Sequence, residues 1–454
     1  MRIHLLALRA GMLRVGIPNC RKQSAIFPAE QGNTRNRLRR ARKDSFAKFW
    51  ERTPLSIQGA GIQGAGNPDS GNHWDVIVLG LGGVGSSAAY HLAAAGLKVL
   101  GIDQFAPVHD QGSSHGHTRV IRQAYFEHPA YVPLLRRAYE LWDQVEQQTK
   151  RKLFHRTGLV EIGPSDGIVI PGVKKSAATH GLQIETMSMT ELSQRWPAIQ
   201  GDLSWEVVIE SNAGYLRVED CVAAHLELAS QHGAVFRHGE TVHQWQQVGD
   251  GVEVTTQQGV QRSANLVIAA GAWSAQILNQ YNVPLSVLRK YQYWFSADEK
   301  HFGAESGFPC FFFETPHGYF YGFPNIDTAG VKIARHSGGV AIPGPSKTQD
   351  DVDPDDLAAV RSFSERHLHG VTNELRRQAG CYYTMTPDEN FVIDQLPDCP
   401  QVKVIAGLSG HGFKFTSVLG ELAKNMVLKS AQKTSQGHEV AAPSELFRFD
   451  RFTD

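Results

Sequence analysis

Two histidines and two arginines fall within the stretch GSSHGHTRVIRQAY at positions 112–125. Arg119 and Arg122 are three residues apart, so a helical turn would place both on one side. Such a pair either belongs to a hydrated surface or forms a socket for an anion, since guanidinium groups bind carboxylates through charge-assisted hydrogen bonds. The choice depends on what the chain places before and long after this stretch.

A glycine-rich segment, WDVIVLGLGGVGSSAAYHLAAAGLKVLGID at 74–103, predicts a dinucleotide-binding βαβ unit directly before the stretch. Gly80, Gly82 and Gly85 have GxGxxG spacing, which allows a tight turn, backbone approach to a pyrophosphate and close packing of helix on strand. The pyrophosphate would lie at the helix amino terminus. Asp103 ends the second strand, 21 residues after Gly82, where its carboxylate accepts from a ribose hydroxyl. An acid there favours NAD or FAD over NADP.

Two later segments favour FAD over NAD. Alternating residues at 233–274 predict antiparallel strands that end in NLVIAAGAW, with Gly271 in the following turn. At 377–428 the strand VKVIAGL runs into a turn with Gly410 and Gly412. An amphipathic helix follows, with an apolar face made of Phe415, Val418, Leu419, Leu422 and Met426. A second helix amino terminus directed at the ligand suits a flavin, whose N1–C2=O edge becomes negative on reduction.

Length and charge limit the classes of function. The 454 residues are enough for two or three compact units, and 45 basic residues balance 45 acidic ones, so no basic field recruits nucleic acid or anionic membranes. No apolar run approaches the roughly 20 residues of a membrane-spanning helix. The five cysteines are scattered without a CxxC pair, which argues against a disulfide framework or a metal site. We therefore expect a soluble protein of the reducing cytoplasm.

Residues 1–72 differ in composition from the rest. The first 50 residues hold nine Arg and three Lys against only Glu30 and Asp44, and 58–72 are a Gly-rich linker. We interpret 1–72 as a disordered extension, or as the result of a start site placed too far upstream. An organellar presequence is the alternative.

Seven blocks occur in order between about residues 74 and 450: GSSHGHTRVIRQAY, YVPLLRRAYELW, RTGLVEIGP, GYFYGFP, GVKIARHSGG, AGCYYTMTPDENFVID and GLSGHGFKFTSVLGE. With these blocks the chain resembles the monomeric sarcosine oxidase and N-methyltryptophan oxidase family of FAD-dependent amine oxidases, which have a DAO-type fold. The extension at 1–73 has no counterpart in that family.

The resemblance implies an α/β fold with a discontinuous Rossmann-type FAD-binding domain and a mixed-sheet α+β substrate domain. We expect the FAD domain at 73–160, 220–285 and 378–432, and the substrate domain at 161–219 and 286–377. Residues 433–454 would pack back on the FAD domain, and the protein would be a monomer with its site at the domain interface.

The resemblance also answers the question raised by the arginine pair. Arg122 and Lys414 match the two cations that bind the substrate carboxylate, and His336 and Tyr321 match residues of the amine pocket. Lys332 and His336 would share one face of a strand, about 13 Å apart. Without the resemblance, Lys332 reads equally well as a lysine that protects a sheet edge.

Other residues match cofactor positions of the family. Cys381 matches the cysteine that holds FAD covalently through its 8α-methyl carbon, although an isolated cysteine is more often buried packing. Arg119 and His115 match flavin-site residues, the arginine stabilising reduced, anionic flavin. Lys332 matches the lysine proposed to activate oxygen beside flavin N5. One departure concerns charge: SHGHTR here replaces the family's HHGDTR, so His117 stands in place of an acid.

The resemblance implies oxidation of secondary, N-alkyl amino acids such as sarcosine. The products would be formaldehyde, the primary amino acid and hydrogen peroxide. Three alternatives stay open: a flavin dehydrogenase of the same fold with an acceptor other than oxygen, an NAD-dependent dehydrogenase, and a non-catalytic dinucleotide sensor. A serine hydrolase is not indicated, because the sequence has no nucleophile elbow.

Overall fold

The computed structural model describes residues 73–452 apart from 279–280, 282, 347–351 and 432–444. The predictions for 1–72, and for most of 433–454, therefore concern residues outside this range. All described elements belong to one compact unit, Pro68–Asp454. No helix within the described ranges is long and apolar enough to cross a membrane.

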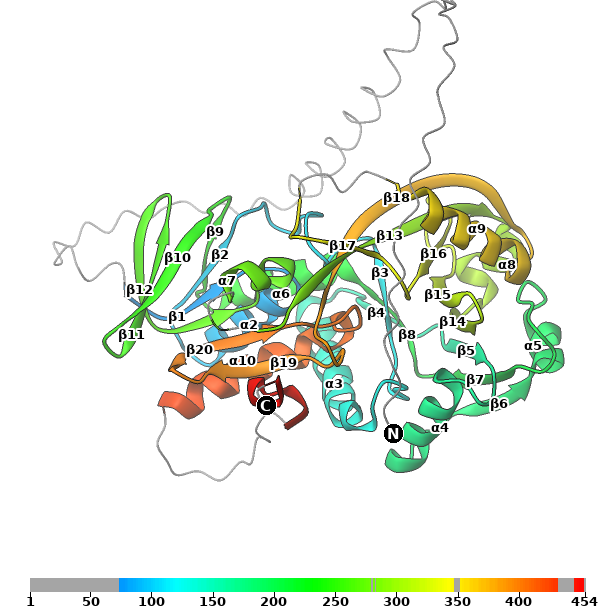
Figure 1. Ribbon diagram of the computed structural model, residues 1–454, viewed down its shortest axis with the longest axis horizontal. Helices are drawn as coiled ribbons and strands as arrows, with labels where there is room; N and C mark the ends of the chain where they lie inside the picture. The colour runs from blue at the N-terminus through cyan, green and yellow to red at the C-terminus, as the bar shows by residue number, and fades with distance from the viewer. Residues whose placement is uncertain (1–72, 279–280, 282, 347–351, 432–444, 453–454) are drawn as a thin grey trace, which may run out of the picture. The chain divides into compact units, whose positions relative to one another are not determined.

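The first large sheet has eight strands in the order β10-β11-β12-β1-β2-β9, with β20 beside β12 and β19 beside β20 (Figure 1). Its strands are β1 His73–Leu79, β2 Val99–Asp103, β9 Val235–His238, β10 Val242–Val248, β11 Gly251–Thr256, β12 Gly259–Ile268, β19 Val392–Leu396 and β20 Cys399–Ala406. The central strands β20, β12, β1, β2 and β9 run parallel. The two predicted strands on either side of the glycine motif are confirmed as β1 and β2.

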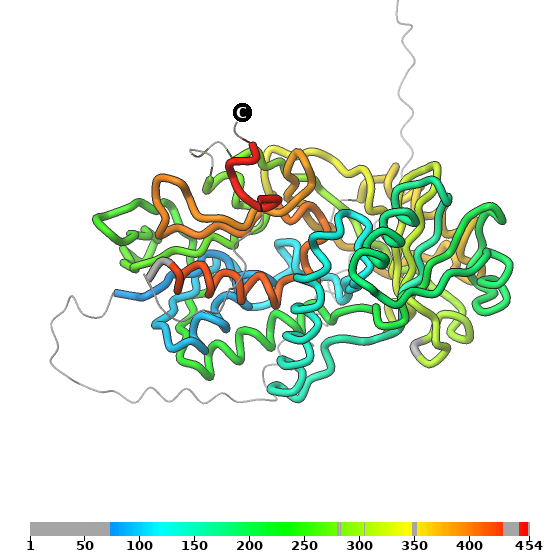
Figure 2. The backbone as a smooth tube through the Cα atoms, turned by 90° about the horizontal axis from the view of Figure 1, so that it is seen from below, coloured from blue at the N-terminus to red at the C-terminus, as the bar shows by residue number. Residues whose placement is uncertain are grey.

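Helices cover this sheet, and the glycine motif opens one of them. They are α2 Gly83–Ala94, α3 Val132–Thr149, α6 Val218–Gln231 and α10 Thr416–Ala431, which is preceded by η5 Phe413–Phe415. Helix α2 packs against both α6 and α10, and Figure 2 shows α10 beside α2. Small residues such as Ala88 and Ala89 in α2 meet Val418 and Leu419 of α10 in one buried cluster. The predicted amphipathic helix is therefore confirmed, and burial of its apolar stripe holds α10 against the helix that follows the glycine motif.

The second large sheet has nine strands in the order β17-β13-β16-β15-β14-β5-β7-β6, with β18 also beside β13. Its strands are β5 Leu159–Gly163, β6 Glu185–Ser188, β7 Glu206–Glu210, β13 Ser286–Ala297, β14 Cys310–Thr315, β15 Gly318–Phe323, β16 Val331–Arg335, β17 Val340–Ile342 and β18 Val371–Met385. β14 runs parallel to β5 and the other pairs are antiparallel, so the predicted mixed sheet is confirmed. Helix α9 Pro354–His367 covers one face, where Phe363 stacks on Phe320 with ring centroids 4.4 Å apart.

The remaining helices are short. They are η1 Pro129–Tyr131, α4 Val169–His180, α5 Met189–Arg195, η2 Gly271–Trp273, α7 Ser274–Ile277, α8 Glu299–Phe302, η4 Ala304–Ser306, η6 Glu445–Phe447 and η7 Phe449–Phe452. The last two pack on β19, where the backbone N–H of Phe449 donates to Asp394 Oδ2 at 2.9 Å.

Strands β13 and β18 form a long curved pair (Figure 1). β18 runs past residue 377, where the substrate domain is predicted to end, and stays in the second sheet as far as Met385. Cys381 therefore lies in the same sheet as Lys332. The division into a cofactor domain and a substrate domain stays a prediction.

A small third sheet carries the arginine stretch. β3 Thr118–Ile121 pairs antiparallel with β8 Gly214–Arg217, which also pairs with β4 Phe154–His155. Arg119 lies in β3 opposite Leu216, and Arg122 follows the end of the strand. The helical turn considered for this pair is therefore wrong, because pairing with β8, about 100 residues away, extends the backbone.

Candidate active site

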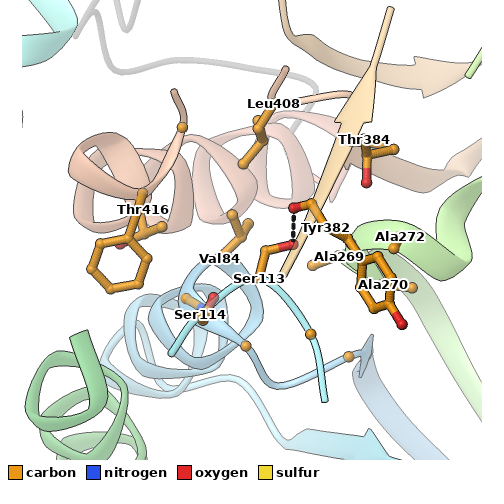
Figure 3. Close-up of a pocket in the computed structure, with 18 of the residues that line it drawn as sticks. Val84, Ser113, Ser114, Ala269, Ala270, Ala272, Tyr382, Thr384, Leu408 and Thr416 are labelled. Carbon is orange, nitrogen blue, oxygen red and sulfur yellow. Dashed lines mark hydrogen bonds between the residues drawn. The ribbon is translucent and has the colours of Figure 1, made fainter. Parts of the chain in front are cut away.

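Several distant segments surround one cavity of about 440 Å³. Figure 3 shows part of its wall, with Val84 of α2, Ser113, Tyr382 of β18 and Thr416 of α10 around it. The Ser113 hydroxyl donates to the Tyr382 carbonyl oxygen at 2.7 Å, which ties the arginine stretch to the strand that carries Cys381. The predicted site residues that line the cavity are Gly80, Gly82, Asp103, Arg119, Arg122, Gly271, Tyr321, His336, Gly410, Gly412 and Lys414. The other four, Gly85, His115, Lys332 and Cys381, are buried near it without lining it.

The glycine motif forms a cradle at one end of the cavity. A Cβ on Gly85 would lie 1.7 Å from the Gly80 carbonyl oxygen, so only glycine allows this approach of helix to strand. Gly82 is the N-cap of α2 and makes no side-chain cap bond, and the first turn of α2 holds no acid. The backbone N–H of Gly83 donates to the Ser114 hydroxyl at 3.0 Å, and a positive helix end without an acid suits a pyrophosphate.

Asp103 lies at the carboxyl end of β2 beside this cradle. Its Oδ2 accepts from the Leu81 backbone N–H at 2.7 Å, and its Oδ1 accepts from the Phe105 N–H at 2.9 Å. Burial opposes ionisation, but the hydrogen bond and charge of His109 and the two N–H donors hold the pKa of Asp103 below its usual value. The ionised carboxylate at this strand end fits a ribose hydroxyl, so the residues present fit a dinucleotide cofactor.

Arg122 also lines the cavity, where it is buried and already ion-paired. Its Nη2 donates to both carboxylate oxygens of Glu127, at 3.0 and 2.7 Å, and its Nη1 donates to the Ala124 carbonyl at 3.1 Å. The guanidinium lies between the rings of Tyr125 and Phe126, 4.4 Å from each centroid. Burial alone would raise the pKa of Glu127, but the Arg122 charge, with His411 and Lys414, lowers it to about 2. Glu127 therefore occupies the Nη2 donors of Arg122.

Lys414 is the second predicted cation in the cavity wall. Its Nζ donates to the His411 carbonyl at 2.8 Å and lies 5.1 Å from the Tyr125 ring centroid. Burial, and then the charge of Arg122, lower the pKa of Lys414 to about 7. The structure thus brings the predicted cation pair, Arg122 and Lys414, to one cavity from segments far apart in sequence.

His336 and Tyr321 line the same cavity. His336 follows β16, which ends at Arg335, so Lys332 and His336 do not share one strand as predicted. His336 Nδ1 lies 3.3 Å from the Tyr383 hydroxyl. Burial, with the charge of Lys290, lowers the pKa of His336 to about 3, so the imidazole is neutral at physiological pH.

Lys332 is held by the arginine stretch itself. Its Nζ donates to the carbonyls of Gly116 at 2.7 Å and Thr118 at 2.9 Å, and to the Thr118 hydroxyl at 3.4 Å. Burial and the charge of Arg119 lower the pKa of Lys332 well below its usual value. The two carbonyl oxygens that accept from Nζ favour the ammonium, whereas the Thr118 hydroxyl can accept from an ammonium or donate to a neutral amine.

Arg119 and His115 lie beside Lys332. Arg119 Nη2 donates to the Ser113 carbonyl at 2.8 Å, and its Nη1 donates to Gln292 Oε1 at 3.3 Å. His115 Nε2 lies 3.1 Å from the Gly112 carbonyl, and burial with the charge of Arg119 lowers the pKa of His115 to about 4. His117 stands where the family has an acid. Its Nδ1 lies 3.1 Å from Asp327 Oδ2, so a carboxylate from another segment lies beside this position.

Cys381 is buried and directly precedes two residues that line the cavity, Tyr382 and Tyr383. It pairs directly with Lys290 across β13 and β18. Lys290 Nζ donates to the carbonyls of three consecutive residues, 336–338, at 3.1, 2.7 and 3.0 Å. The ammonium thus joins the strand pair that holds Cys381 to the loop that carries His336.

Sequence reasoning missed the acidic residues that contact the cation pair Arg122 and Lys414, which we call the carboxylate clamp. Glu127 follows Arg122 by five residues within a matched region, but nothing in its spacing shows that its side chain folds back on the guanidinium. Glu161 left a clearer signal, because it is the one charged residue in the apolar run GLVEIG. Its Oε1 lies 3.6 Å from Arg122 Nε.

Comparison with known proteins decides the protein family. A family model described as DAO, FAD dependent oxidoreductase, matches residues 75–426, which is most of the chain. The chain belongs to this family. The resemblance recognised in the sequence is thereby confirmed, together with the fold class.

Two groups of curated relatives are similar to this family member over most of its length. The monomeric sarcosine oxidase of Arthrobacter sp. (strain TE1826) is 37% identical over 359 residues, 78% of this chain and 92% of the relative. The N-methyl-L-tryptophan oxidase of Yersinia pestis (strain Pestoides F) is 38% identical over 352 residues, 77% of this chain and 94% of the relative. Among solved structures, the open form of NikD, an unusual amino acid oxidase essential for nikkomycin biosynthesis, has a TM-score of 0.70 at 23% identity. It covers 80% of this chain and 96% of its own, and supports the fold alone.

Proposed function

We propose that this FAD-dependent oxidoreductase is an oxidase of secondary, N-methyl amino acids such as sarcosine. The observation that carries the proposal is the pair of buried cations, Arg122 and Lys414, in the wall of the same cavity that begins at the dinucleotide cradle. A non-catalytic dinucleotide sensor needs no such pair. The names of the relatives point to the same class of substrate.

The substrate carboxylate would bind Arg122 and Lys414. Glu127 accepts from Arg122 Nη2, so binding at that nitrogen exchanges one carboxylate for another on the same guanidinium. Two cations on one carboxylate give charge-assisted hydrogen bonds, which are roughly twice as strong as neutral ones. This anchor fixes the amino acid with its N-methyl group toward the cradle end.

The amine would lie beside His336 and Tyr321. Because burial keeps His336 neutral, it adds no positive charge that would compete with the amine, and it accepts or donates one hydrogen bond. FAD, when bound, supplies the acceptor for the two electrons of the C–N oxidation. Water then hydrolyses the imine to formaldehyde and the primary amino acid, and oxygen takes both electrons and two protons to become hydrogen peroxide.

Lys332 would assist the oxygen step. Its buried ammonium, held by two backbone carbonyls, is a fixed positive charge close to Arg119 and Cys381. A fixed cation in a water-poor site stabilises negative charge as oxygen is reduced. The role of Arg119 and His115 at the cofactor is proposed on the same grounds of position.

Cys381 would hold FAD covalently. Its position directly before Tyr382 and Tyr383, both in the cavity wall, supports this assignment. Acid precipitation of purified protein tests it, because covalent flavin stays yellow in the pellet. Cys381→Ala should release the colour into the supernatant. Cys399→Ala is the matched control, since Cys399 is equally buried at 3% exposure but lies on β20.

The activity itself is tested with a panel of N-methyl amino acids and their unmethylated counterparts. We expect one formaldehyde and one hydrogen peroxide for each N-methyl group removed. Turnover without peroxide would mean that the electrons pass to an acceptor other than oxygen, and the protein would then be a dehydrogenase. A colourless protein without turnover on any member would overturn the proposal. Gel filtration with light scattering tests the monomeric state that the relatives' names suggest.

A further inference from the structure

Glu161 is a buried acid that the proposed reaction does not use. It lies in β5, directly between Phe312 of β14 and Val208 of β7, and both neighbours are apolar. Its side chain is fully buried, and neither carboxyl oxygen has a hydrogen-bond partner within the described part of the chain. Phe312 lines the cavity, so Glu161 shares its strand position with a wall residue.

The contact that Glu161 makes is with Arg122. Oε1 lies 3.6 Å from Arg122 Nε, which is beyond hydrogen-bond length but within ion-pair distance. The Nη atoms of the same guanidinium are taken by Glu127 and by the Ala124 carbonyl. Arg122 therefore has one carboxyl group on the cavity side and a second one at Nε.

The charges around Glu161 do not balance if it is ionised. Arg122 and Lys414 are the cations that face it, and Glu127 and Glu210 are the other acids. Glu210 accepts three hydrogen bonds from the backbone N–H groups of residues 123 and 124. Glu161 has no such donors, and an ionised carboxylate without donors is costly to bury. Burial, aided by Glu210 and Glu127 against Arg122 and Lys414, raises the pKa of Glu161 to about 8.

A bound carboxylate would add one more negative charge to this cluster. With Glu161 protonated, Arg122 and Lys414 face the ligand and Glu127, so two cations meet two anions before Glu210 is counted. With Glu161 ionised, the same two cations face a third anion. Ligand binding and ionisation of Glu161 therefore oppose each other.

We propose that Glu161 is a positioning residue that couples a proton to carboxylate binding at Arg122. It keeps its proton while a ligand carboxylate is bound, and when ionised it draws Arg122 Nε to itself and repels the ligand. The inference rests on the carboxylate clamp of the proposed function. It predicts that affinity for carboxylate ligands falls as the pH rises through the range in which free Glu161 ionises, by up to tenfold for each pH unit.

The test uses a ligand that binds without turnover. Methoxyacetate has the shape of sarcosine with an ether oxygen in place of N–H, so it offers the carboxylate but no amine. Its dissociation constant is measured by calorimetry on the holoenzyme between pH 6 and pH 9, in buffers of different ionisation enthalpy. These buffers report protons taken up on binding. Wild type is compared with Glu161→Gln and Glu161→Leu.

Lys414 also loses its charge, and with it affinity for anions, as the pH rises. The quantity compared between wild type and variants is therefore the slope of the methoxyacetate dissociation constant against pH. From pH 7 to pH 9 the dissociation constant should rise about tenfold more in wild type than in either variant, and binding at pH 8 should take up fewer protons in both. If Glu161 had only a structural role, the polar Gln variant and the apolar Leu variant would differ from each other in ligand binding. Glu314→Gln is the control, since Glu314 is also buried in this sheet but accepts from the N–H groups of Ile168 and Val169. It should keep the wild-type slope.

Equal slopes in wild type and both Glu161 variants would overturn the inference and leave the clamp intact. Absence of methoxyacetate binding in folded wild type at pH 6 would overturn the clamp as well. If the variants do not fold, infrared difference spectra of wild type at pH 9 replace them. Ligand addition should then raise the C=O band of a protonated carboxylic acid, and its absence would refute the coupling.

Discussion

Replacement of Glu127 by Gln should change stability and ligand affinity in opposite directions. The carboxylate of Glu127 accepts two hydrogen bonds from Arg122 Nη2 and is 18% exposed. Its pKa falls from the ordinary 4.5 to about 2, which corresponds to about 3 kcal/mol of favourable interaction in the folded state. Because the side chain is partly exposed, this is an upper value. Glu127→Gln should therefore lower the free energy of unfolding at pH 7 by about 2–3 kcal/mol.

The same change removes the carboxylate that a ligand must displace. We expect methoxyacetate to bind Glu127→Gln at least tenfold more tightly than wild type, which corresponds to about 1.4 kcal/mol. That is less than the interaction lost, because the Gln amide oxygen still accepts one hydrogen bond from Arg122. Calorimetric titration gives the affinity, and urea unfolding gives the stability.

The pH dependence has a definite sign. The folded pKa of Glu127 lies below the unfolded one, so its stabilising effect is complete above about pH 4.5 and is lost as the pH falls toward 2. The stability difference between variant and wild type should thus shrink at pH 3. Glu140→Gln is the control, because Glu140 is 60% exposed and should change neither property. Weaker or unchanged ligand binding in Glu127→Gln would refute the account of Arg122 as a guanidinium held by an internal competitor.

Three further outcomes follow from buried groups. Lys332→Met should leave reduction by substrate intact in anaerobic stopped-flow but slow the reaction with oxygen on the order of 10²-fold; an unchanged oxygen rate would refute its role. Gly85→Ala should abolish cofactor retention, measured by the flavin spectrum, because the new Cβ would lie 1.7 Å from the Gly80 carbonyl oxygen. His225→Leu should raise the free energy of unfolding at pH 7 by about 1–2 kcal/mol, since neither ring nitrogen of buried His225 has a hydrogen-bond partner among the residues that the structure describes. Because burial lowers the pKa of His225 to about 3, wild type loses stability as the pH falls below 6.5, and the gain in urea unfolding should grow at pH 5.

The cofactor end was the most predictable part of the site. The glycine spacing, the flanking strands and Asp103 lie within 30 residues, and the constraints on them are local: a turn, a close approach and a strand end. The structure has β1, α2 and β2 where the sequence indicates them. The helix at 416–431 was equally predictable, because its apolar residues recur with helical periodicity.

The structure of the arginine stretch could not be predicted from local sequence in the same way. Spacing alone suggested a helical turn, but pairing with β8 makes a strand of Arg119 and its neighbours. The expected shared strand of Lys332 and His336 was wrong by one residue, since β16 ends at Arg335, although the backbone N–H of His336 still donates to the Tyr319 carbonyl at 2.7 Å. Strand ends depend on the partner strand, which the local sequence does not contain.

By itself, the sequence determined the class of fold and the residues that carry charge into the site, because glycine spacing, apolar periodicity and family motifs are properties of short segments. Only the tertiary structure decided how those charges are paired. Lys332 meets the Gly116 carbonyl across 216 residues of chain, and Arg122 meets Glu161 on a separate strand of the second sheet. In a buried site the protonation of each group depends on its neighbours within a few ångströms, and those neighbours are set by packing of distant segments.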